Sequence, residues 1–338
     1  MKLACFSFTE KGYKIGEAIS KLSNENNYEI HHYPSSKIPE GVNNLLKRIW
    51  SEYEGFIFIS AVGIAVRMIN PFIKHKTIDP AVIVIDDLGK YSISLLSGHL
   101  GGANEIAQWI GEKLGAMPII TTASDNRGID SIDMFAKRNN YFIENMNSTT
   151  KLTSMMVNGK KIGLYTEDGE IIKYDNLVLV QSLENVNLNI DGLIIVSSKL
   201  NISAIEVPYI VLRPKNINIG IGCRKGIEAN MIINAIKSAL NEIEISLESI
   251  KAIGTVEVKK DEAGIIEAAK YFNCSLKIFT IDEIKNIENN FAQSQFVKNT
   301  IGVYSVAEPS AYLLGGKLIK HKSIYNGITI AVSRSIHN

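Results

Sequence analysis

The chain has 338 residues, of which 46% are hydrophobic and 21% are charged, so it is long enough for two or three globular domains. Its formal net charge of +1 excludes a general attraction to nucleic acid or anionic membranes, and any anion site must come from a local group of cations. Three widely spaced cysteines without a CxxC pair indicate neither a zinc site nor a disulfide framework and favour a reducing cytoplasm. The longest apolar run, 56–66, is about half of the ~20 residues that a membrane span needs.

The first part of the chain alternates short apolar runs with segments of helical period, which is typical of an α/β protein. The run at 56–60 is apolar almost throughout and predicts a strand buried on both faces. Residues 82–86 and 91–95 flank a turn and predict a hairpin. The other expected strands are 2–8, 28–33 and 118–122, and the expected helices are 15–22, 42–50 and 103–114.

From about residue 145 the pattern changes to short strands between glycine-containing turns, and we expect a small α/β middle domain over 145–214. Pro208 and the Arg213-Pro214 pair predict a linker into the last domain. The sequence therefore predicts a multi-domain α/β protein, with three-layer α/β domains at 1–144 and 215–338. In the last domain the expected strands are 217–221 and 327–332, and the expected helices are 227–240, 261–272 and 306–314.

Three polar loops follow predicted strands in the first domain, at 60–67, 97–104 and 121–125. In open α/β sheets, ligands bind beyond the carboxyl ends of the strands. We therefore expect these three loops to converge on one crevice.

The loop at 97–104, Ser-Gly-His-Leu-Gly-Gly-Ala-Asn, carries the strongest local signal. Three glycines around His99 let the backbone approach a ligand closely, and the amides of the following helix can hold a carboxylate. Histidine changes charge near neutral pH, which suits a general base. The alternative is a tight turn whose histidine caps the helix; the three glycines favour the functional interpretation.

Four other charged residues have both a functional and a structural interpretation. Arg67 lies on an otherwise apolar helix, so we expect it to have a partner, whereas the nearby Lys76 is also compatible with a solvated surface. Asp86 ends a buried strand, where a turn-forming carboxylate is the alternative. Glu308 stands at a helix start, where a capping carboxylate is the alternative.

Residues 220–226, Gly-Ile-Gly-Cys-Arg-Lys-Gly, resemble a dinucleotide-binding loop, but their spacing is GxGxxxG and not GxGxxG. We interpret this segment as a glycine-rich anion loop in which Arg224 and Lys225 supply positive charge. The sequence contains no GxSxG, HExxH or P-loop motif, so it does not support a serine hydrolase, a zincin or a P-loop NTPase.

Taken together, these stretches resemble the CbiG family of cobalamin biosynthesis, the cobalt-precorrin-5A hydrolases. Segment 92–104, Ser-Ile-Ser-Leu-Leu-Ser-Gly-His-Leu-Gly-Gly-Ala-Asn, carries the most specific part of the resemblance. The middle of the chain, 145–214, matches the family by position only. The other matching stretches are 62–67, 76–82, 86–89 and 121–125 near the start and 220–224, 260–262 and 305–308 near the end.

The resemblance implies a cytoplasmic hydrolase of anaerobic cobalamin (vitamin B12) biosynthesis, whose substrate is a cobalt-bearing macrocycle with acetate and propionate arms. Hydrolysis opens a δ-lactone and releases acetaldehyde to give cobalt-precorrin-5B. Because the substrate carries the cobalt, the resemblance implies no cofactor and no metal site in the protein. It implies no nucleic-acid or membrane partner, and it makes neighbouring enzymes of the pathway candidate partners.

Such a site needs a group that activates water and donors that hold carboxylates. The candidate catalytic residues are His99, Asp86, Asp125 and Glu308. The candidate substrate-binding residues are Gly63, Arg67, Lys76, Gly98, Gly101, Gly102, Asn104, Thr121, Thr122, Gly222, Arg224 and Glu262. Two other functions stay open: a non-catalytic corrinoid carrier in which His99 ligates cobalt, and a nucleotide-binding α/β enzyme that uses 220–226.

Overall fold

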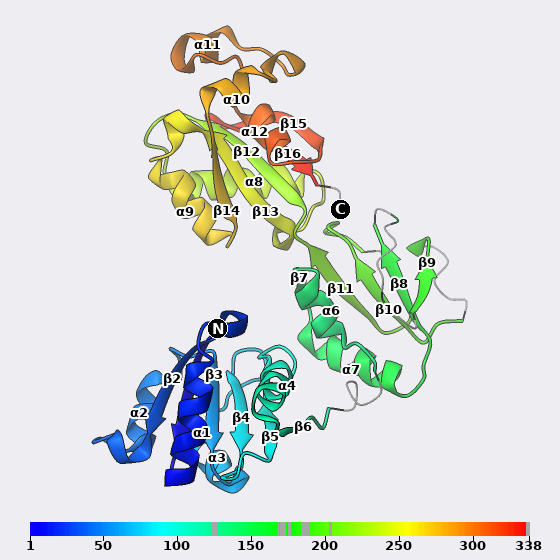
Figure 1. The fold of residues 1–338 in the computed structure, drawn as a ribbon. Coiled ribbons are helices and arrows are strands. Elements are labelled where there is room, and N and C mark those ends of the chain that lie inside the picture. Colours follow the sequence, from blue (N-terminus) through cyan, green and yellow to red (C-terminus); the bar gives the residue numbers. More distant parts are fainter. Residues whose placement is uncertain are drawn as a thin grey trace. The chain divides into compact units, whose positions relative to one another are not determined.

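The computed structural model describes residues 1–122, 128–167, 169, 174, 177–183, 189–202 and 205–335. The chain forms two compact units, Met1–Met134 and Phe135–Asn338, and contains three β-sheets with flanking helices (Figure 1). The predicted α/β class with several sheets is confirmed.

The first unit is built on a six-stranded sheet in the order β2-β1-β3-β4-β5-β6. Strands β1 to β4 run parallel, β5 is antiparallel to β4, and β6 is parallel to β5. β3 and β4 are buried at every residue, as their apolar runs predict. The strands are β1 (Lys2–Ser7), β2 (Glu29–Pro34), β3 (Gly55–Ile59), β4 (Ala81–Ile85), β5 (Tyr91–Leu96) and β6 (Met117–Ile119).

Helices cover both faces of this sheet and give the predicted three layers (Figure 1). Successive side chains of a strand point to opposite faces. Ile83 therefore packs in the core under α1 and α4, whereas Val84 packs in the core under α2 and α3. The helices are α1 (Glu10–Lys21), α2 (Val42–Ile49), α3 (Val62–Ile69) and α4 (Ala103–Leu114), with 3-10 turns η1 (Glu25–Asn27) and η2 (Ser35–Lys37).

The second unit holds a five-stranded sheet in the order β7-β11-β10-β8-β9, in which only β7 runs antiparallel to its neighbour. Helix α7 (Met146–Val157) contacts three of its strands. The strands are β7 (Tyr141–Ile143), β8 (Ile162–Thr166), β9 (Leu177–Val180), β10 (Gly192–Val196) and β11 (Tyr209–Pro214); α6 (Ile132–Arg138) precedes β7 in the chain. Because β7 belongs here, this sheet begins before residue 145; the expected division of the chain at 144 and 214 stays a prediction.

The predicted linker at Pro208 and 213–214 is wrong, because Tyr209–Pro214 forms strand β11. Arg213 is only 2% exposed. Its Nε donates to Glu144 Oε1 at 2.6 Å, and its Nη1 donates to the carbonyl of Ser197 at 2.9 Å. Proline at the end of a strand and a paired buried arginine both look like loop residues in a sequence, although neither is one here.

The third sheet, also in the second unit, has the order β14-β13-β12-β16-β15. Helices α8 and α9 pack with one face, and α12 packs with the other (Figure 1). The predicted helices and strands of this region are present, with ends that differ by a few residues. The strands are β12 (Ile217–Cys223), β13 (Ile250–Val256), β14 (Ser275–Phe279), β15 (Lys317–Tyr325) and β16 (Ile328–Arg334). The helices are α8 (Ala229–Asn241), α9 (Ala263–Tyr271), α10 (Ile281–Lys285), α11 (Gln295–Ile301) and α12 (Ala307–Leu313), with 3-10 turns η4 (Leu247–Ser249), η5 (Glu257–Lys259) and η6 (Glu288–Asn290).

A buried carboxylate joins the second and third sheets. Glu167, after β8, has a side chain only 7% exposed and pairs with Arg334, at the end of β16, at 2.8 Å. Its Oε2 accepts hydrogen bonds from the Ser197 hydroxyl at 3.0 Å and the Ser198 amide at 2.8 Å. Burial raises the pKa of Glu167, but Arg334 and these donors outweigh burial, so the net pKa is lowered. The ionised carboxylate therefore stabilises the contact between the two sheets.

Candidate functional site

Two of the three predicted loops meet at one edge of the first sheet. The loop at 97–102 follows β5, and residues 120–122 follow β6, which is parallel to β5. Asn104, at the start of α4, connects them: its Oδ1 accepts a hydrogen bond from Ser94 Oγ at 2.6 Å, and its Nδ2 donates to Thr122 Oγ1 at 3.2 Å. The structure thus brings the predicted residues Asn104 and Thr122 together; Thr121 lies beside them in the chain.

The third predicted loop lies at the opposite edge, so the expectation of a single crevice is wrong for it. β4 and β5 are antiparallel, with Val82 opposite Leu96, so the end of β5 lies beside the start of β4. The end of β3 lies instead beside Ile85, at the end of β4. Gly63, at the start of α3, follows the end of β3 and is therefore separated from His99 by the length of the sheet.

Asp86 lies at that opposite edge too, where its carboxylate is bound by its own turn. Asp86 Oδ1 accepts a hydrogen bond from the Tyr91 amide at 2.7 Å, and Oδ2 accepts one from the Leu88 amide at 3.2 Å. This is the turn-forming alternative, in which the carboxylate orders the hairpin between β4 and β5.

The glycines around His99 allow the loop to fold tightly on itself. A Cβ atom at Gly98 would lie 2.6 Å from Asn104 Oδ1, and one at Gly101 would lie 2.8 Å from the Ser97 carbonyl oxygen. Gly102 has φ +84° and stands directly before α4, a conformation that side chains disfavour. The space at Gly98 and Gly101 is therefore filled by the loop's own atoms, and the approach of the loop backbone to a ligand stays a prediction.

His99 lies in this loop beside two buried polar side chains. Its Nδ1 is 3.3 Å from Ser131 Oγ and 3.9 Å from Asp133 Oδ1. Ser131 and Asp133 are 4% and 8% exposed, and the His99 side chain is 17% exposed. Neither partner was recognisable in the sequence, because both lie over 30 residues from His99 and in no recognised motif. A polar Ser-Ile-Asp at the start of α6 was the only local signal.

The two candidate cations of the first unit, Arg67 and Lys76, are exposed. Lys76 lies in the segment that leads from α3 into β4, and β4 begins at the edge of the sheet that carries the His99 loop. At that edge, a Cβ on Gly101 would lie 3.3 Å from the Ala81 amide. Arg67 donates to the carbonyl of Gly63 at 3.1 Å, within its own helix. Among the residues that the structure describes, Arg67 makes no hydrogen bond or ion pair outside α3, contrary to our expectation.

The glycines of 220–226 lie mainly in a strand, so the predicted anion loop is wrong for Gly220 and Gly222. Both belong to β12, and a Cβ at Gly220 would overlap the carbonyl oxygen of Ala307 and approach the Ala311 amide to 2.6 Å. Gly220 is thus needed for the close approach of α12 to the sheet. A Cβ at Gly222 would meet the Thr329 hydroxyl at 2.6 Å. This packing also removes support for a nucleotide-binding loop.

Beyond β12 the chain turns through a short exposed segment that contains Arg224. Glu262 fastens this turn, because its Oε1 accepts a hydrogen bond from the Gly226 amide at 2.6 Å and its Oε2 pairs with Lys259 at 3.4 Å. Arg224 and Glu262 therefore lie near the end of β12, but the Glu262 carboxylate is occupied by protein groups.

Glu308 is 2% exposed. Its Oε1 accepts hydrogen bonds from His321 Nδ1 at 2.8 Å and from the Lys322 amide at 3.3 Å, both on β15. Its Oε2 has no hydrogen-bond partner among the described residues. The carboxylate therefore does not cap α12, and its catalytic role stays a prediction. The fourth catalytic candidate, Asp125, lies outside the described residues.

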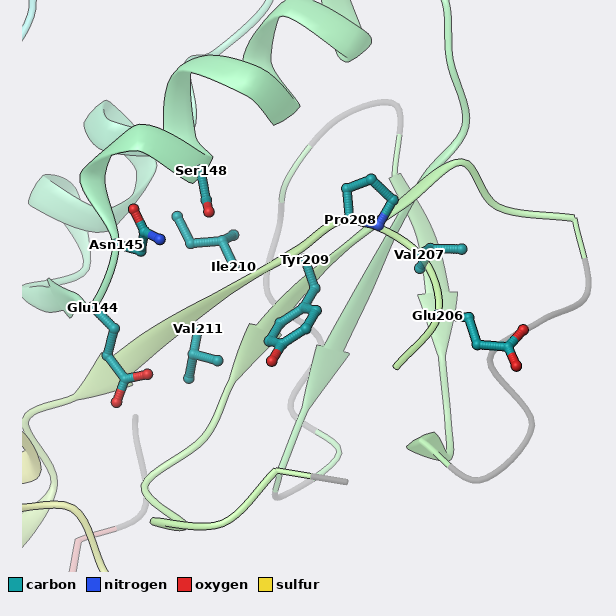
Figure 2. A pocket seen from close by; sticks show the side chains of 9 residues that line it. All are labelled: Glu144, Asn145, Ser148, Glu206, Val207, Pro208, Tyr209, Ile210 and Val211. Atoms are coloured by element: carbon teal, nitrogen blue, oxygen red, sulfur yellow. The ribbon is translucent and has the colours of Figure 1, made fainter. Parts of the chain in front are cut away.

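A pocket of about 670 Å³ lies beside β11 and the start of α7 (Figure 2). No predicted site residue lines it. Of the two carboxylates in its lining, Glu144 pairs with Arg213 at 2.6 Å, and neither supplies a positive charge for a ligand with carboxylate arms. The lining residues are Glu144, Asn145, Ser148, Glu206, Val207, Pro208, Tyr209, Ile210 and Val211.

Within the part of the chain that the structure describes, no group of three or more His, Cys, Asp or Glu side chains is placed to hold a metal ion. Within the same ranges, no helix is both long and apolar enough to cross a bilayer.

Three family models match the chain along most of its length. The model for the cobalamin synthesis G N-terminal region matches residues 44–125, and the model for the cobalamin biosynthesis central region matches 131–214. The model for the cobalamin synthesis G C-terminus matches 217–333.

Curated relatives match nearly the whole chain. A cobalt-precorrin-5A hydrolase from Salmonella typhimurium is 34% identical over 98% of this chain and 97% of the relative. A cobalt-precorrin-5A hydrolase from Priestia megaterium is 32% identical over 98% of this chain and 94% of the relative. A solved cobalamin biosynthesis protein G homolog from Sulfolobus solfataricus is 26% identical, with a TM-score of 0.40, over 99% of this chain and 97% of that chain. The resemblance seen in the sequence is confirmed: the chain belongs to the CbiG family of cobalamin biosynthesis.

Proposed function

We propose that the chain is a cobalt-precorrin-5A hydrolase, which opens the δ-lactone of its substrate and releases acetaldehyde. The observation that carries this proposal is the end-to-end match to two curated relatives of that name, at 34% and 32% identity. The loop at 97–102 supports it, because the loop places a partly exposed imidazole beside a buried carboxylate, an arrangement suited to proton transfer.

In the proposed reaction, His99 is the general base. It takes a proton from a water molecule whose oxygen bonds to the lactone carbonyl carbon, and the bond from that carbon to the ring oxygen breaks. The freed oxygen becomes the carbonyl oxygen of acetaldehyde as the carbon–carbon bond to the macrocycle breaks. The electron pair of that bond stays on the macrocycle, which takes up a proton. Such a base contributes about 10²–10⁴-fold to the rate.

The edge of the sheet that carries His99 also offers groups suited to the substrate. Lys76 supplies a cation for a carboxylate arm. Ile78, two residues further on, is 67% exposed and offers apolar surface for the macrocycle. Asn104 and Thr122 supply polar groups from the adjoining loops. We place the scissile lactone at this edge.

The other predicted contacts have weaker roles in the proposal. Arg67 and Arg224 are exposed cations that can attract carboxylate arms from solution. We propose that the cobalt belongs to the substrate, that the protein supplies no cofactor, and that the reaction takes place in the cytoplasm. Enzymes that make the substrate or use the product are the proposed partners.

The test mixes the purified chain with cobalt-precorrin-5A and measures acetaldehyde together with the visible spectrum. The proposal requires release of one acetaldehyde per corrinoid consumed. A spectral change on binding without acetaldehyde would indicate a carrier. The absence of both signals would exclude both functions.

A further inference from the structure

The third sheet carries an exposed histidine that a buried carboxylate holds in place. The side chain of His321, on the edge strand β15, is 84% exposed, whereas that of Glu308, on α12, is 2% exposed. Nδ1 of His321 lies 2.8 Å from Glu308 Oε1, which also accepts a hydrogen bond from the Lys322 amide at 3.3 Å. A carboxylate oxygen can only accept, so Nδ1 is the donor, and in the neutral imidazole Nε2 keeps its lone pair. The exposure of the ring leaves Nε2 accessible to a ligand.

An irregularity of β15 brings both donors to the carboxylate. Between Lys320 and Ser323 the pairing of β15 with β16 shifts register, so that two residues of β15 stand opposite one of β16. This is a β-bulge, which changes the direction of side chains and is frequent at sheet edges and beside functional sites. His321 and Lys322 are the residues of the bulge, which explains how an imidazole nitrogen and the next backbone amide reach the same oxygen.

The other oxygen of Glu308 is buried at a cost in free energy. Oε2 has no hydrogen-bond partner among the described residues, and a buried polar atom without a partner is destabilising. The hydrogen bonds of this carboxylate go to His321 and Lys322 of the bulge. Its chemical effect therefore falls on the imidazole, because it fixes the orientation of the ring and raises the basicity of Nε2.

The pair has the construction of a supported metal ligand. A histidine that binds a metal through one ring nitrogen almost always donates the other N–H to a group such as a carboxylate. One imidazole is too few for a bare metal ion, and among the described residues the pair belongs to no group that could hold one. A cobalt ion inside a corrin-type macrocycle is different, because the ring nitrogens take its equatorial positions and leave the axial positions open. Such a metal needs only one exposed imidazole and a surface for the ring.

Aromatic side chains beside the pair offer that surface. Tyr312 follows Glu308 by one turn on the same side of α12 and is 48% exposed. Its ring lies against Phe291, with the ring centroids 5.7 Å apart. The segment that contains Phe291 is joined to the bulge, since Lys322 Nζ donates to the carbonyl of Ala292 at 3.0 Å. The third sheet and its flanking segments therefore place an imidazole, an aromatic pair and a cation in one region.

We propose that His321, held by Glu308, binds the cobalt of a corrinoid through Nε2 as an axial ligand. This inference rests on the proposed function, which supplies the cobalt-bearing macrocycle. On binding, a water molecule leaves an axial position of the cobalt and the lone pair of Nε2 forms the new bond, while the cobalt keeps its oxidation state. The proton on Nδ1 stays in its hydrogen bond to the carboxylate.

The experiment uses the full chain and the cobalt(II) form of cobinamide, a corrinoid without a lactone whose axial water is exchangeable. Electron paramagnetic resonance identifies the axial ligand, because one axial nitrogen splits each cobalt line into a triplet and water does not. We expect the triplet with the wild type. His321→Ala should lose the triplet and should bind cobinamide about tenfold more weakly.

Matched variants separate the imidazole from its surroundings, and thermal unfolding checks that each is folded. His75→Ala removes another exposed histidine, which is bonded to the Thr77 hydroxyl at 2.8 Å, and it should keep the triplet. His321→Gln leaves an amide that can donate to Glu308 but no imidazole nitrogen, so it should lose the triplet. Glu308→Gln keeps an acceptor for Nδ1 but removes the charge, so it should keep the triplet and weaken binding by a smaller factor than His321→Ala.

The outcomes are separable. A triplet that persists in folded His321→Ala overturns the inference, and so does a wild type that binds cobinamide without a triplet or does not bind it. If His321→Ala does not fold, His321→Gln decides by the same signal. The same preparations are tested for acetaldehyde release from cobalt-precorrin-5A. Release by a wild type that shows no triplet overturns this inference alone, whereas a triplet without release overturns the proposed function and leaves the corrinoid site standing.

Discussion

Two glycine-rich segments are similar in sequence but have different structural roles: 97–102, which follows a strand of the first sheet, and 220–226, which begins within a strand of the third sheet. In the first, the glycines shape a loop that ends beside a buried serine and carboxylate and carries a partly exposed histidine. In the second, Gly220 lies inside strand β12 and must be a glycine because the backbone of α12 occupies the place of a side chain. A cluster of glycines therefore indicates that other atoms lie close to the backbone. The identity of those atoms decides whether the glycines belong to a functional site or to the packing of the fold.

The largest effect should come from Gly220→Ala, which tests the packing role of the second segment. The added methyl would overlap the carbonyl of Ala307, and a helix backbone cannot turn aside as a side chain can. We expect the free energy of unfolding to fall by about 3 kcal/mol. Urea unfolding measures it.

Gly222→Ala is the matched control on the same strand. Its methyl would meet the Thr329 side chain, which can rotate, so the loss should be smaller. Equal losses in the two variants would mean that the strand, and not the approach of α12, sets the requirement for glycine.

The next effect concerns Glu167, whose role should be stability and not catalysis. Glu167→Gln removes the charge that pairs with Arg334, and we expect a loss of about 2 kcal/mol at neutral pH. Because the folded-state pKa of Glu167 is lowered, its stabilisation is complete above the ordinary glutamate pKa and disappears as pH falls through the lower folded value. The difference between wild type and variant should therefore shrink in acid.

Urea unfolding at neutral and acid pH measures this difference. The control is Glu242→Gln, an exposed carboxylate paired with Lys320 at 2.7 Å, which should change stability little. If Glu167→Gln has the same free energy of unfolding as the wild type at neutral pH, other contacts hold the two sheets together.

The smallest effect should come from the exposed arginines. Arg67→Ala and Arg224→Ala should each weaken corrinoid binding by about two- to fivefold, since an exposed charge pair contributes roughly 1 kcal/mol or less. Wild-type affinity should fall as salt is added. Titration of the visible spectrum with corrinoid measures both effects. If binding does not depend on salt and both variants keep the wild-type affinity, the glycine loops hold the substrate and the arginines do not.

The sequence predicted the elements well where apolar runs are unbroken, as in β3 and β4, because burial on both faces leaves a plain signal. It predicted His99, Asn104 and Thr122 as neighbours of one site, and the structure places Asn104 against Thr122. It failed where strand direction matters: because β5 runs antiparallel to β4, the loop that contains His99 lies at the edge of the sheet opposite to Gly63 and Asp86. It failed also at Arg213, where a distant carboxylate makes burial possible.

The most direct test of the account compares turnover in His99→Ala with turnover in Glu308→Gln, the two described catalytic candidates that are not held in a surface turn. Glu308 is 2% exposed and bonded to β15, whereas His99 is partly exposed beside Asp133. The account predicts that His99→Ala loses about 10²-fold or more of its acetaldehyde release while still binding the corrinoid, and that folded Glu308→Gln stays close to wild type. Near-normal release by His99→Ala together with a large loss in Glu308→Gln would contradict it and move the chemistry to the third sheet.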